Sequence, residues 1–412
     1  MSELSFIERL LDGARVEWKA LGEVCDVFTG GEAPENSIKG SIPTNDYKYP
    51  IYGNGAEIYG YTDTYRIDKD AVTISSIGAN TGTIYYREAF FTPIIRLKVL
   101  MPKQEWLISK YIFHYLASQT IYSKKSSVPN MNAADVKRIQ IPIPCPDDPE
   151  KSLKIQAEIV RILDAFTELS TELSTELSLR KKQYGYYRER LLSFEEGTTK
   201  DTKSTKGVEW KTLGEIIKKS YSGGTPTAGN SEYYDGGTIP WLRTQEVRFS
   251  DIEKTEVKIT SSALKDTAVK WIPTNCVIIA ISGATAGRSA INKIPLTTNQ
   301  HCCCLEIDPK KALYRYVFHW VSLNYNNLKG LGQGARGDLN SGIIKNFQIP
   351  IPYADDPEKS LNEQARIVAI LDKFDALTNS ISEGLPREIE LRKKQYEYYR
   401  DMLLSFPKPE EE

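Results

Sequence analysis

Two nearly identical stretches decide the fold: LRKKQYGYYRERLLSF at residues 179–194 and LRKKQYEYYRDMLLSF at residues 391–406, which lie 212 positions apart. Both are rich in Leu, Arg, Lys, Gln and Glu, which favour helix. A long helix that occurs twice indicates a chain built by internal duplication.

Apolar residues upstream of both stretches recur at steps of three and four, which is the spacing of a single helical face, broken once in the second copy by the adjacent pair Ile370-Leu371. They are Ile155, Ile159, Ile162, Phe166, Leu169 and Leu173 in the first copy, and Ile367, Ile370, Leu371, Phe374, Leu377 and Ile381 in the second. Faces this narrow are typical of coiled coils, so we expect two antiparallel helices of about 40 residues, each about 60 Å long. Gly384 and Pro386 predict an interruption of the second helix, and Ser360 with Glu363 predicts a capping box at its start.

A perfect triple TELS repeat occupies residues 167–178 of the first helix. The corresponding interval, from Phe374 to Leu391, lacks the repeat and is four residues longer than the interval from Phe166 to Leu179. The repeat is either a solvated stretch of helix formers or an adjustable ruler. As a ruler, each unit would add about 6 Å and turn the helix by about 40°.

The rest of each half is a divergent module that shares only short islands with its counterpart: 16–19 with 208–211, 78–82 with 283–287, 111–115 with 316–320, and 140–144 with 348–352. Short apolar runs bounded by Gly, Pro and Asn predict strands at 72–74 and 276–281, and apolar faces predict helices near 105–117 and 311–323. We expect the Pro-rich segments after each module to stop regular structure.

The predicted fold class is therefore α+β, with two globular domains, two long helices and pseudo-two-fold internal symmetry. The predicted boundaries are 1–150 for the first globular domain, 151–200 for the first long helix, 201–354 for the second globular domain and 355–412 for the second long helix.

Composition restricts the class of protein. Lys plus Arg number 53 against 54 for Asp plus Glu, which excludes a cationic coat over the whole chain but not a local basic face. No apolar run has the roughly 20 residues of a membrane span, and the N-terminal residues do not resemble a signal peptide. The adjacent Cys302, Cys303 and Cys304 do not suit a disulfide framework, so we expect buried thiols and a cytoplasmic location.

No catalytic constellation, cofactor-binding motif or metal-ligand spacing is evident. The segment 283–289 has too few residues between its glycines for a phosphate loop, and we interpret it as a tight turn that presents backbone amides and Arg288. His114 and His319 occupy equivalent aromatic stretches, where a buried, hydrogen-bonded histidine is favoured over a catalytic base. Asp147-Asp148 and Asp355-Asp356 precede helices, where they suit the N-terminal dipole.

Polar and glycine-rich loops in both modules offer hydroxyls, amides and Arg, the groups that contact phosphates and base edges. We predict DNA binding by Gly30, Gly31, Asn54, Asn80, Thr81, Gly223, Gly224, Thr225, Arg243, Thr244, Gln245, Arg288, Asn299 and Gln300.

With these motifs, the chain resembles the specificity subunits of type I restriction–modification systems. The resemblance is carried by GGTP (223–226), IPWL (239–242), SGATAG (282–287), TTNQ (297–300), residues 334–352 and the two RKKQY helix ends. It implies two target-recognition domains that each read half of a split, asymmetric double-stranded DNA sequence. It also implies a non-catalytic chain whose helices set the gap and dock two modification (methyltransferase) subunits, with restriction (translocase/nuclease) subunits as further partners. S-adenosylmethionine and ATP would bind to those partners. The first module departs from the pattern, with GGEAP at 30–34 in place of GGTP.

Basic and aromatic residues gather at the ends of both long helices, where a protein-binding face is favoured over simple interaction with the helix dipole. The predicted partner-binding residues are Arg180, Lys181, Lys182, Tyr184, Tyr187, Arg188, Arg392, Lys393, Lys394, Tyr396, Tyr399 and Arg400.

Two other classes of function compete with this interpretation. A structural adaptor, with a coiled coil carrying two protein- or ligand-binding modules, would explain the duplication but not why the modules diverge while the helices stay alike. A fused methyltransferase is the weaker alternative, because no methyl-donor motif is evident.

Overall fold

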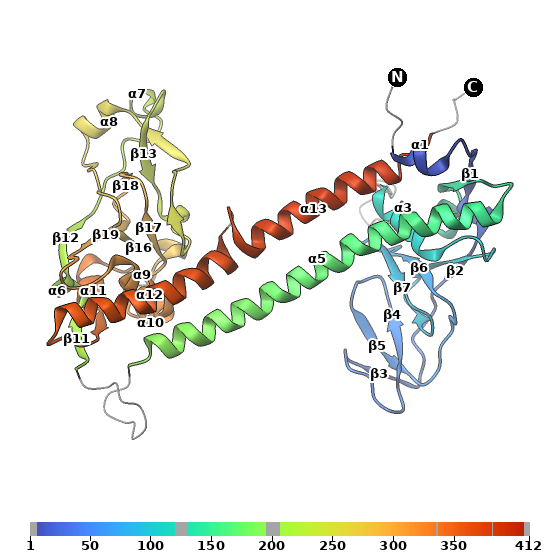
Figure 1. Ribbon diagram of the computed structural model, residues 1–412, viewed down its shortest axis with the longest axis horizontal. Helices are drawn as coiled ribbons and strands as arrows, with labels where there is room; N and C mark the ends of the chain where they lie inside the picture. The colour runs from blue at the N-terminus through green and yellow to red at the C-terminus, as the bar shows by residue number, and fades with distance from the viewer. Residues whose placement is uncertain (1–5, 120–129, 195–206, 335–336, 381, 408–412) are drawn as a thin grey trace. The chain divides into compact units, whose positions relative to one another are not determined.

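The computed structural model describes residues 6–119, 130–194, 207–334, 337–380 and 382–407 (Figure 1). The chain divides into two compact units. The first unit comprises Met1–Leu173 and Ile389–Glu412, and the second unit comprises Ser174–Glu388. Helix α5 (Pro149–Leu192) begins in the first unit and ends in the second, so both halves of the sequence supply helix to each unit.

The first unit contains two four-stranded sheets and a separate strand pair. One sheet has the antiparallel order β2-β9-β6-β7, and helix α3 (Ser109–Ser118) packs on β6 and β7. The other has the order β3-β5-β4-β8, in which β8 runs parallel to β4. The strands are β1 (Val16–Ala20), β2 (Cys25–Thr29), β3 (Ser37–Lys39), β4 (Tyr49–Tyr52), β5 (Ile58–Thr62), β6 (Ala71–Ile74), β7 (Ile84–Arg87), β8 (Thr92–Pro93), β9 (Lys98–Pro102) and β10 (Gln140–Pro144). The short helices are α1 (Phe6–Leu11), α2 (Leu21–Val24) and α4 (Ala133–Lys137).

The second unit repeats this plan. Its larger sheet has the order β12-β19-β16-β17-β14, and its smaller sheet has the order β15-β13-β18, with β18 parallel to β13. The strands are β11 (Glu209–Thr212), β12 (Ile217–Tyr221), β13 (Ile239–Leu242), β14 (Asp251–Ile252), β15 (Val257–Ile259), β16 (Val277–Ala280), β17 (Ser289–Asn292), β18 (Thr297–Thr298), β19 (Cys302–Ile307) and β20 (Gln348–Ile351). The helices of its module are α6 (Leu213–Ile216), α7 (Ser231–Tyr234), α8 (Ser261–Asp266), α9 (Tyr314–Leu323), α10 (Tyr325–Gly330) and α11 (Ser341–Asn346), with 3-10 turns η1 (Thr244–Glu246) and η2 (Gly283–Thr285).

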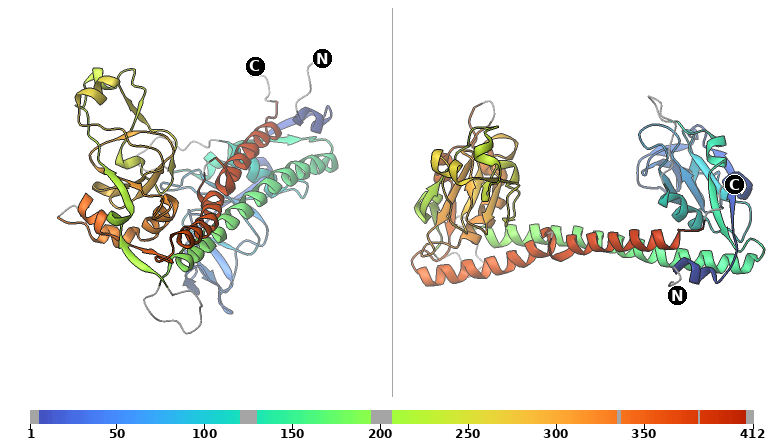
Figure 2. Two further views of the ribbon diagram at one scale, coloured as in Figure 1. Left: turned by 60° about the vertical axis from the view of Figure 1, so that its left-hand side comes forward. Right: turned by 90° about the horizontal axis from the view of Figure 1, so that it is seen from above.

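The two units therefore share a topology. The order β2-β9-β6-β7 corresponds to β12-β19-β16-β17, and the parallel pair β4–β8 corresponds to β13–β18. In each unit the strands form a body on one side of the long helices (Figure 2). The predicted α+β duplication is confirmed, as are the strands β6 and β16 and the helices α3 and α9.

The expectation that the Pro-rich segments stop regular structure is wrong. They form β10 and β20, which pair antiparallel with β1 and β11, so that Pro142 lies opposite Trp18 and Pro350 opposite Trp210. Each pair is a two-stranded sheet, so every strand in it has an unpaired edge. Proline is tolerated there because its missing N–H costs no ladder hydrogen bond.

The long helices are antiparallel. In the first unit, Ile155 and Ile159 near the start of α5 share a hydrophobic core with Leu403 at the end of α13 (Gly384–Leu403). In the second unit, Leu192 at the end of α5 shares a core with Ile367 of α12 (Pro357–Asn379).

The predicted interruption of the second helix is confirmed. Helix α12 ends at Asn379 and α13 begins at Gly384, which adopts a φ of +77°, a left-handed conformation that suits glycine. The predicted capping box at Ser360 is wrong, because the N-cap is Asp356, whose carboxylate accepts from Lys359 N at 3.1 Å. Pro357 takes the first helical position, where its missing N–H is harmless. Ile381 of the predicted apolar face lies outside the described residues.

Candidate nucleic-acid interface

In the second unit, the glycine-rich segment after β12 packs against the segment after β18. A Cβ atom at Gly223 would lie 1.7 Å from the carbonyl oxygen of Thr298, so only glycine fits there. Gly224 N donates to the same oxygen at 3.0 Å, and the Thr225 hydroxyl donates to Oε1 of Gln300 at 2.5 Å. The structure thus brings four of the predicted DNA-binding residues into one cluster.

Asn299 connects this cluster to the end of β13. Its backbone N–H donates to Leu242 O at 3.1 Å, and its side-chain oxygen accepts from His301 N at 3.1 Å. The Cys302 thiol also lies 3.5 Å from that oxygen. The Asn299 side-chain oxygen therefore shapes the loop, while the neighbouring Gln300 is exposed.

Arg243, Thr244 and Gln245 directly follow β13 at the same end of the unit. The Arg243 guanidinium is held within the protein: Nη2 lies 2.6 Å from Glu256 Oε2, and Nε lies 3.5 Å from Glu246. The side-chain amide of Gln245 is oriented so that its oxygen faces Arg243. This oxygen accepts a hydrogen bond from Arg243 Nη2 at 2.9 Å. The roles of these residues in DNA binding stay predictions, but Arg243 also stabilises its own loop.

The predicted tight turn at 283–287 is present, and several of its backbone amides form hydrogen bonds within the protein. The amides of Gly283, Ala286 and Gly287 donate to Asp338 Oδ1, Gly283 O and Ala280 O, so they are not available to a phosphate. The turn therefore uses three of its five backbone donors itself, and an anion site at its remaining amides, those of Ala284 and Thr285, stays a prediction. In the described part of the chain, no partner contacts the Arg288 guanidinium, and that side chain stays a candidate.

The first unit places Gly30 and Gly31 as the second unit places its glycines. A Cβ at Gly30 would lie 2.8 Å from Ile94 N, and Gly31 O accepts from Ile95 N at 2.8 Å. The segment from Gly30 to Gly31 thus packs against 94–96, the segment that follows β8.

The other predicted DNA-binding residues of the first unit lie in loops, where side chains form hydrogen bonds to the backbone. The Asn54 side chain accepts from Ser76 N at 2.7 Å and donates to Ile95 O. Asn80 and Thr81 belong to a turn in which the Thr81 hydroxyl donates to Gly78 O at 2.7 Å. Asn54 therefore fixes the backbone of its neighbours, and all these loops meet at one end of the unit.

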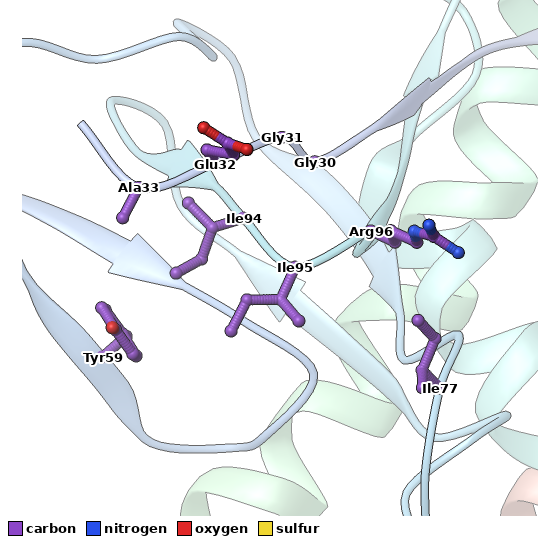
Figure 3. Close-up of a pocket in the computed structure, with 9 residues that line it drawn as sticks. All are labelled: Gly30, Gly31, Glu32, Ala33, Tyr59, Ile77, Ile94, Ile95 and Arg96. Carbon is purple, nitrogen blue, oxygen red and sulfur yellow. The ribbon is translucent and has the colours of Figure 1, made fainter. Parts of the chain in front are cut away.

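A cavity of about 530 Å³ lies among these loops (Figure 3). Its lining includes Gly31, Glu32, Tyr59, Ile95 and Arg96. Figure 3 shows the Ile95 side chain directed toward the space beside Tyr59, with Arg96 extending away from it on the side of Ile77. The sequence analysis did not single out Ile95 or Arg96, because the segment carries no motif.

The four tyrosines predicted to bind partners pack inside the helix pair. Tyr184 and Tyr187 stack on Phe374 with ring centroids 6.1 and 5.4 Å apart, and Tyr399 stacks on Phe166 at 5.3 Å. Tyr396 packs against the core of the first unit. These tyrosines stabilise the helices, whatever else they contact.

The basic residues of the predicted partner face differ in their surroundings. Five of them interact with neighbours on their own helix: Arg180 with Glu176 at 2.7 Å, Arg188 with the Tyr184 ring, Lys394 with Glu390 at 2.6 Å, Arg400 with Asp401 at 2.7 Å, and Arg392 with Gln395 at 2.9 Å. Lys181, Lys182 and Lys393 are exposed.

Two exposed tyrosines were missed by the sequence analysis. Tyr186 is 56% exposed and Tyr398 is 62% exposed, and they occupy equivalent positions of the duplicated helix. Neither lies on the apolar seam formed by Tyr184, Tyr187 and Leu191, and this departure from the helical spacing was the available signal.

In each unit, a buried histidine of the module forms a hydrogen bond to an aspartate of a long helix. His114 Nε2 lies 2.8 Å from Asp164 of α5, and His319 Nε2 lies 2.6 Å from Asp372 of α12. Both imidazoles are almost fully buried. A cation joins each pair: Lys110 lies 2.6 Å from Asp164, and Arg315 lies 2.6 Å from Asp372. The expectation of buried, hydrogen-bonded histidines is confirmed.

Two further interactions of these junctions are duplicated. Oε1 of Gln156 accepts from Ile108 N at 3.0 Å at the start of α3, and Oε1 of Gln364 accepts from Leu313 N at 2.9 Å at the start of α9. The Tyr111 hydroxyl donates to the carbonyl of Pro142, and that of Tyr316 donates to the carbonyl of Pro350. Through these glutamines, α5 supplies a hydrogen-bond acceptor to the start of α3, and α12 supplies one to the start of α9.

Burial and pairing shift the pKa values in these junctions. Burial lowers the pKa of His114, and its hydrogen bond to Asp164 offsets this only in part. Burial alone would raise the pKa of Asp164, but the hydrogen bonds and charges of Lys110 and His114 outweigh it, so that pKa lies below its ordinary value. The His114 imidazole is therefore held neutral beside a carboxylate, which is a structural arrangement.

The six cysteines are buried free thiols. Burial raises the pKa of Cys25, Cys276 and Cys302 to about 12. Thiols this protonated are poor nucleophiles and metal ligands. No helix in the described ranges is long and apolar enough to cross a membrane.

The chain matches the family model described as the type I restriction modification DNA specificity domain twice, over residues 15–179 and 205–391. It is 39% identical to a type I restriction enzyme specificity subunit of Escherichia coli, over 100% of this chain and 99% of that protein. It is 30% identical to a putative type I restriction enzyme specificity subunit of Haemophilus influenzae, over 98% of both chains.

Solved structures share the fold. The S subunit of a type I restriction–modification system from M. genitalium superposes with a TM-score of 0.64 at 16% identity, over 97% of this chain and 98% of that chain. A chain from a structural study of the assembly and conformational transition of the type I restriction–modification system superposes with a TM-score of 0.56 at 15% identity, over 94% of this chain and 97% of that one.

Proposed function

Because the chain belongs to the family of type I restriction–modification DNA specificity proteins, we propose that each of its units reads one half of a bipartite, asymmetric sequence in double-stranded DNA. One observation carries this proposal. Both units build the same loop cluster from a glycine segment packed on the segment after a short parallel strand, yet the side chains differ: Gln300 in the second unit stands where the first unit has Ile95. A shared backbone with different side chains suits two readers with different targets.

The chain itself is proposed to be non-catalytic, with methylation and cleavage supplied by partner subunits. Two modification subunits would dock on the duplicated helix ends, where Tyr186 and Tyr398 repeat as exposed aromatic side chains beside exposed lysines. Restriction subunits would complete the complex. S-adenosylmethionine and ATP would bind to these partners, and the assembly would work in the cytoplasm, where buried free thiols such as Cys302 to Cys304 are stable.

The structural adaptor is the competing function, and the relatives do not favour it, since they are specificity subunits. A selection from a random double-stranded DNA library tests the proposal directly. The full chain, with and without its modification subunits, should enrich a sequence with two defined halves and an undefined gap. A complex that enriched no sequence while binding other proteins tightly would favour the adaptor.

Exchange of residues 207–345 for the homologous module of another specificity subunit is expected to change only one half of the enriched sequence. The two modules have separate hydrophobic cores, so each should keep its own surface when the other is replaced. The same selection, performed on the exchanged protein, reads both halves at once. A change in both halves would contradict independent readers.

A further inference from the structure

We propose that Ile95 and Arg96 determine the specificity of the first unit, with Arg96 reading a guanine and Ile95 contacting a thymine methyl group. This inference rests on the proposed function and names the residues that carry it in the first unit. Neither residue belongs to a recognisable motif, and the assignment comes from backbone placement, conformation and free donors.

The short parallel strands β8 and β18 lead into equivalent segments, 94–96 and 299–301, which precede β9 and β19. Ile94 N donates to Tyr52 O at 2.8 Å, as Asn299 N donates to Leu242 O at 3.1 Å. Gly30 in one unit and Gly223 in the other pack so closely on this segment that a Cβ would collide with its backbone. Ile95 and Arg96 therefore stand where the second unit presents Gln300 and His301.

Ile95 and Arg96 have φ values of +53° and +58°, in the left-handed region that a β-branched residue almost never adopts. The surroundings enforce this conformation: Ile95 N donates to Gly31 O, Arg96 N donates to Gly30 O, and the Ser76 hydroxyl donates to Arg96 O at 2.6 Å. A backbone held in a strained state by so many hydrogen bonds is typical of a functional loop.

Ile95 is 50% exposed although it is apolar, and Arg96 is exposed with no partner for its guanidinium among the described residues. By contrast, the Arg243 guanidinium in the second unit is paired with Glu256 and Glu246. A free guanidinium on a fixed backbone can donate two parallel hydrogen bonds to O6 and N7 of guanine, and an exposed isoleucine can pack on a thymine methyl.

The same loop in the second unit carries two other exposed side chains, Gln300 and His301, and Oε1 of Gln300 also accepts from the Thr225 hydroxyl at 2.5 Å. Glutamine pairs with adenine and arginine with guanine in the major groove. The difference at this one loop therefore explains how two units with one topology would prefer different bases.

The test is a library selection with the full chain assembled with its modification subunits, in the wild type and in Arg96→Ala, Arg96→Lys and Ile95→Ala. We expect Arg96→Ala to relax one base position of one half-site, with discrimination falling about 5- to 150-fold, and to leave the other half-site unchanged. Arg96→Lys should also lose discrimination, because an ammonium group cannot form the two parallel bonds. Ile95→Ala should relax a neighbouring thymine position by a smaller factor.

Arg138→Ala is the matched control, since it removes the same charge from an exposed position at the C-cap of α4 in the same unit. It should leave base preference intact. Circular dichroism melting should be the same for Arg96→Ala and wild type, because the Arg96 side chain has no partner in the fold. A uniform loss on all DNA that Arg96→Lys restores would mark a phosphate contact and overturn the assignment, and so would an unchanged base preference. A wild-type complex that selects no sequence would overturn the proposed function itself.

Discussion

Replacement of Asp372 by alanine is expected to lower the free energy of unfolding of the second unit by about 3 kcal/mol. Asp372 Oδ1 accepts from His319 Nε2 and from Arg315 Nη2, both at 2.6 Å. His319 is fully buried and the Arg315 side chain is only 15% exposed, whereas Asp372 is 35% exposed. The variant therefore leaves a buried ring nitrogen without its acceptor and removes one carboxylate from a largely buried cation. The loss should fall at the low end for a broken buried pair, because Arg315 keeps Asp251 at 2.7 Å. Urea denaturation of the full chain, with hydrogen exchange of α9, measures it.

The first unit supplies a matched control. Asp164→Ala removes the equivalent carboxylate, but Lys110 is 40% exposed and can return to water. The main cost is then the unsatisfied His114, about 1–2 kcal/mol. Equal losses for the two variants, or a loss below about 1 kcal/mol for Asp372→Ala, would contradict the assigned role of Arg315.

The stabilisation by Asp372 is expected to depend on pH. Burial would raise the pKa of Asp372, but hydrogen bonds from His319 and Arg315 and the charge of Arg315 outweigh it, so the pKa lies below its ordinary value of 3.8. The unfolded chain therefore binds the proton more tightly than the folded chain. The stabilisation is complete above the ordinary pKa and is lost as the pH falls through 3.8 toward the folded-state pKa. The difference between wild type and Asp372→Ala should accordingly shrink below about pH 4.

The architecture was largely predictable because it depends on periodicity and repetition, which are properties of the sequence alone. The steps of three and four that begin at Ile155 require a helix with one apolar face, and Gly384 marks the break that the structure shows. The structure differed from the predictions where a local sequence rule is compatible with two structures. Proline stops a central strand but is tolerated at an unpaired edge, and the sequence near Pro142 does not reveal that its partner strand is β1 alone.

The candidate site was less predictable because it depends on contacts between residues far apart in the chain. A glycine pair such as Gly223-Gly224 signals a close approach but not the Thr298 carbonyl that it meets. The sequence around Arg243 gives no sign of an ion-pair partner, yet its guanidinium donates to the carboxylate of Glu256, thirteen residues later. Arg96 has no motif, and only the left-handed backbone and the absence of a described partner distinguish it.

Deletion of Ser170 to Leu173 is expected to shorten the gap in the recognised sequence by one base pair and to leave both halves unchanged. The described helix α5 is continuous through the TELS repeat, and Leu169, Leu173 and Leu177 are half-buried at every fourth position. Removing one unit keeps that spacing, so the helix survives and shortens by about 6 Å. One base pair rises about 3.4 Å, so a spacer parallel to the DNA could change the gap by roughly two pairs at most. Tilt and supercoiling of the helices reduce this to one.

Rotation supports the same change. Each TELS unit turns the helix by about 40°, which is close to the roughly 34–36° between successive base pairs, so a unit could move by one step and still face its groove. An added fourth TELS should lengthen the gap by one pair, whereas deletion of only two residues breaks the apolar face and should abolish binding. The length-matched control Ser170→Ala/Thr171→Ala removes two hydroxyls that donate to the preceding turn but should leave the gap unchanged, because it keeps the helix length. A ruler must change the distance between the two units without changing the bases that they read. If the four-residue deletion left the gap the same, or altered the bases read in either half, the repeat would serve only to form helix.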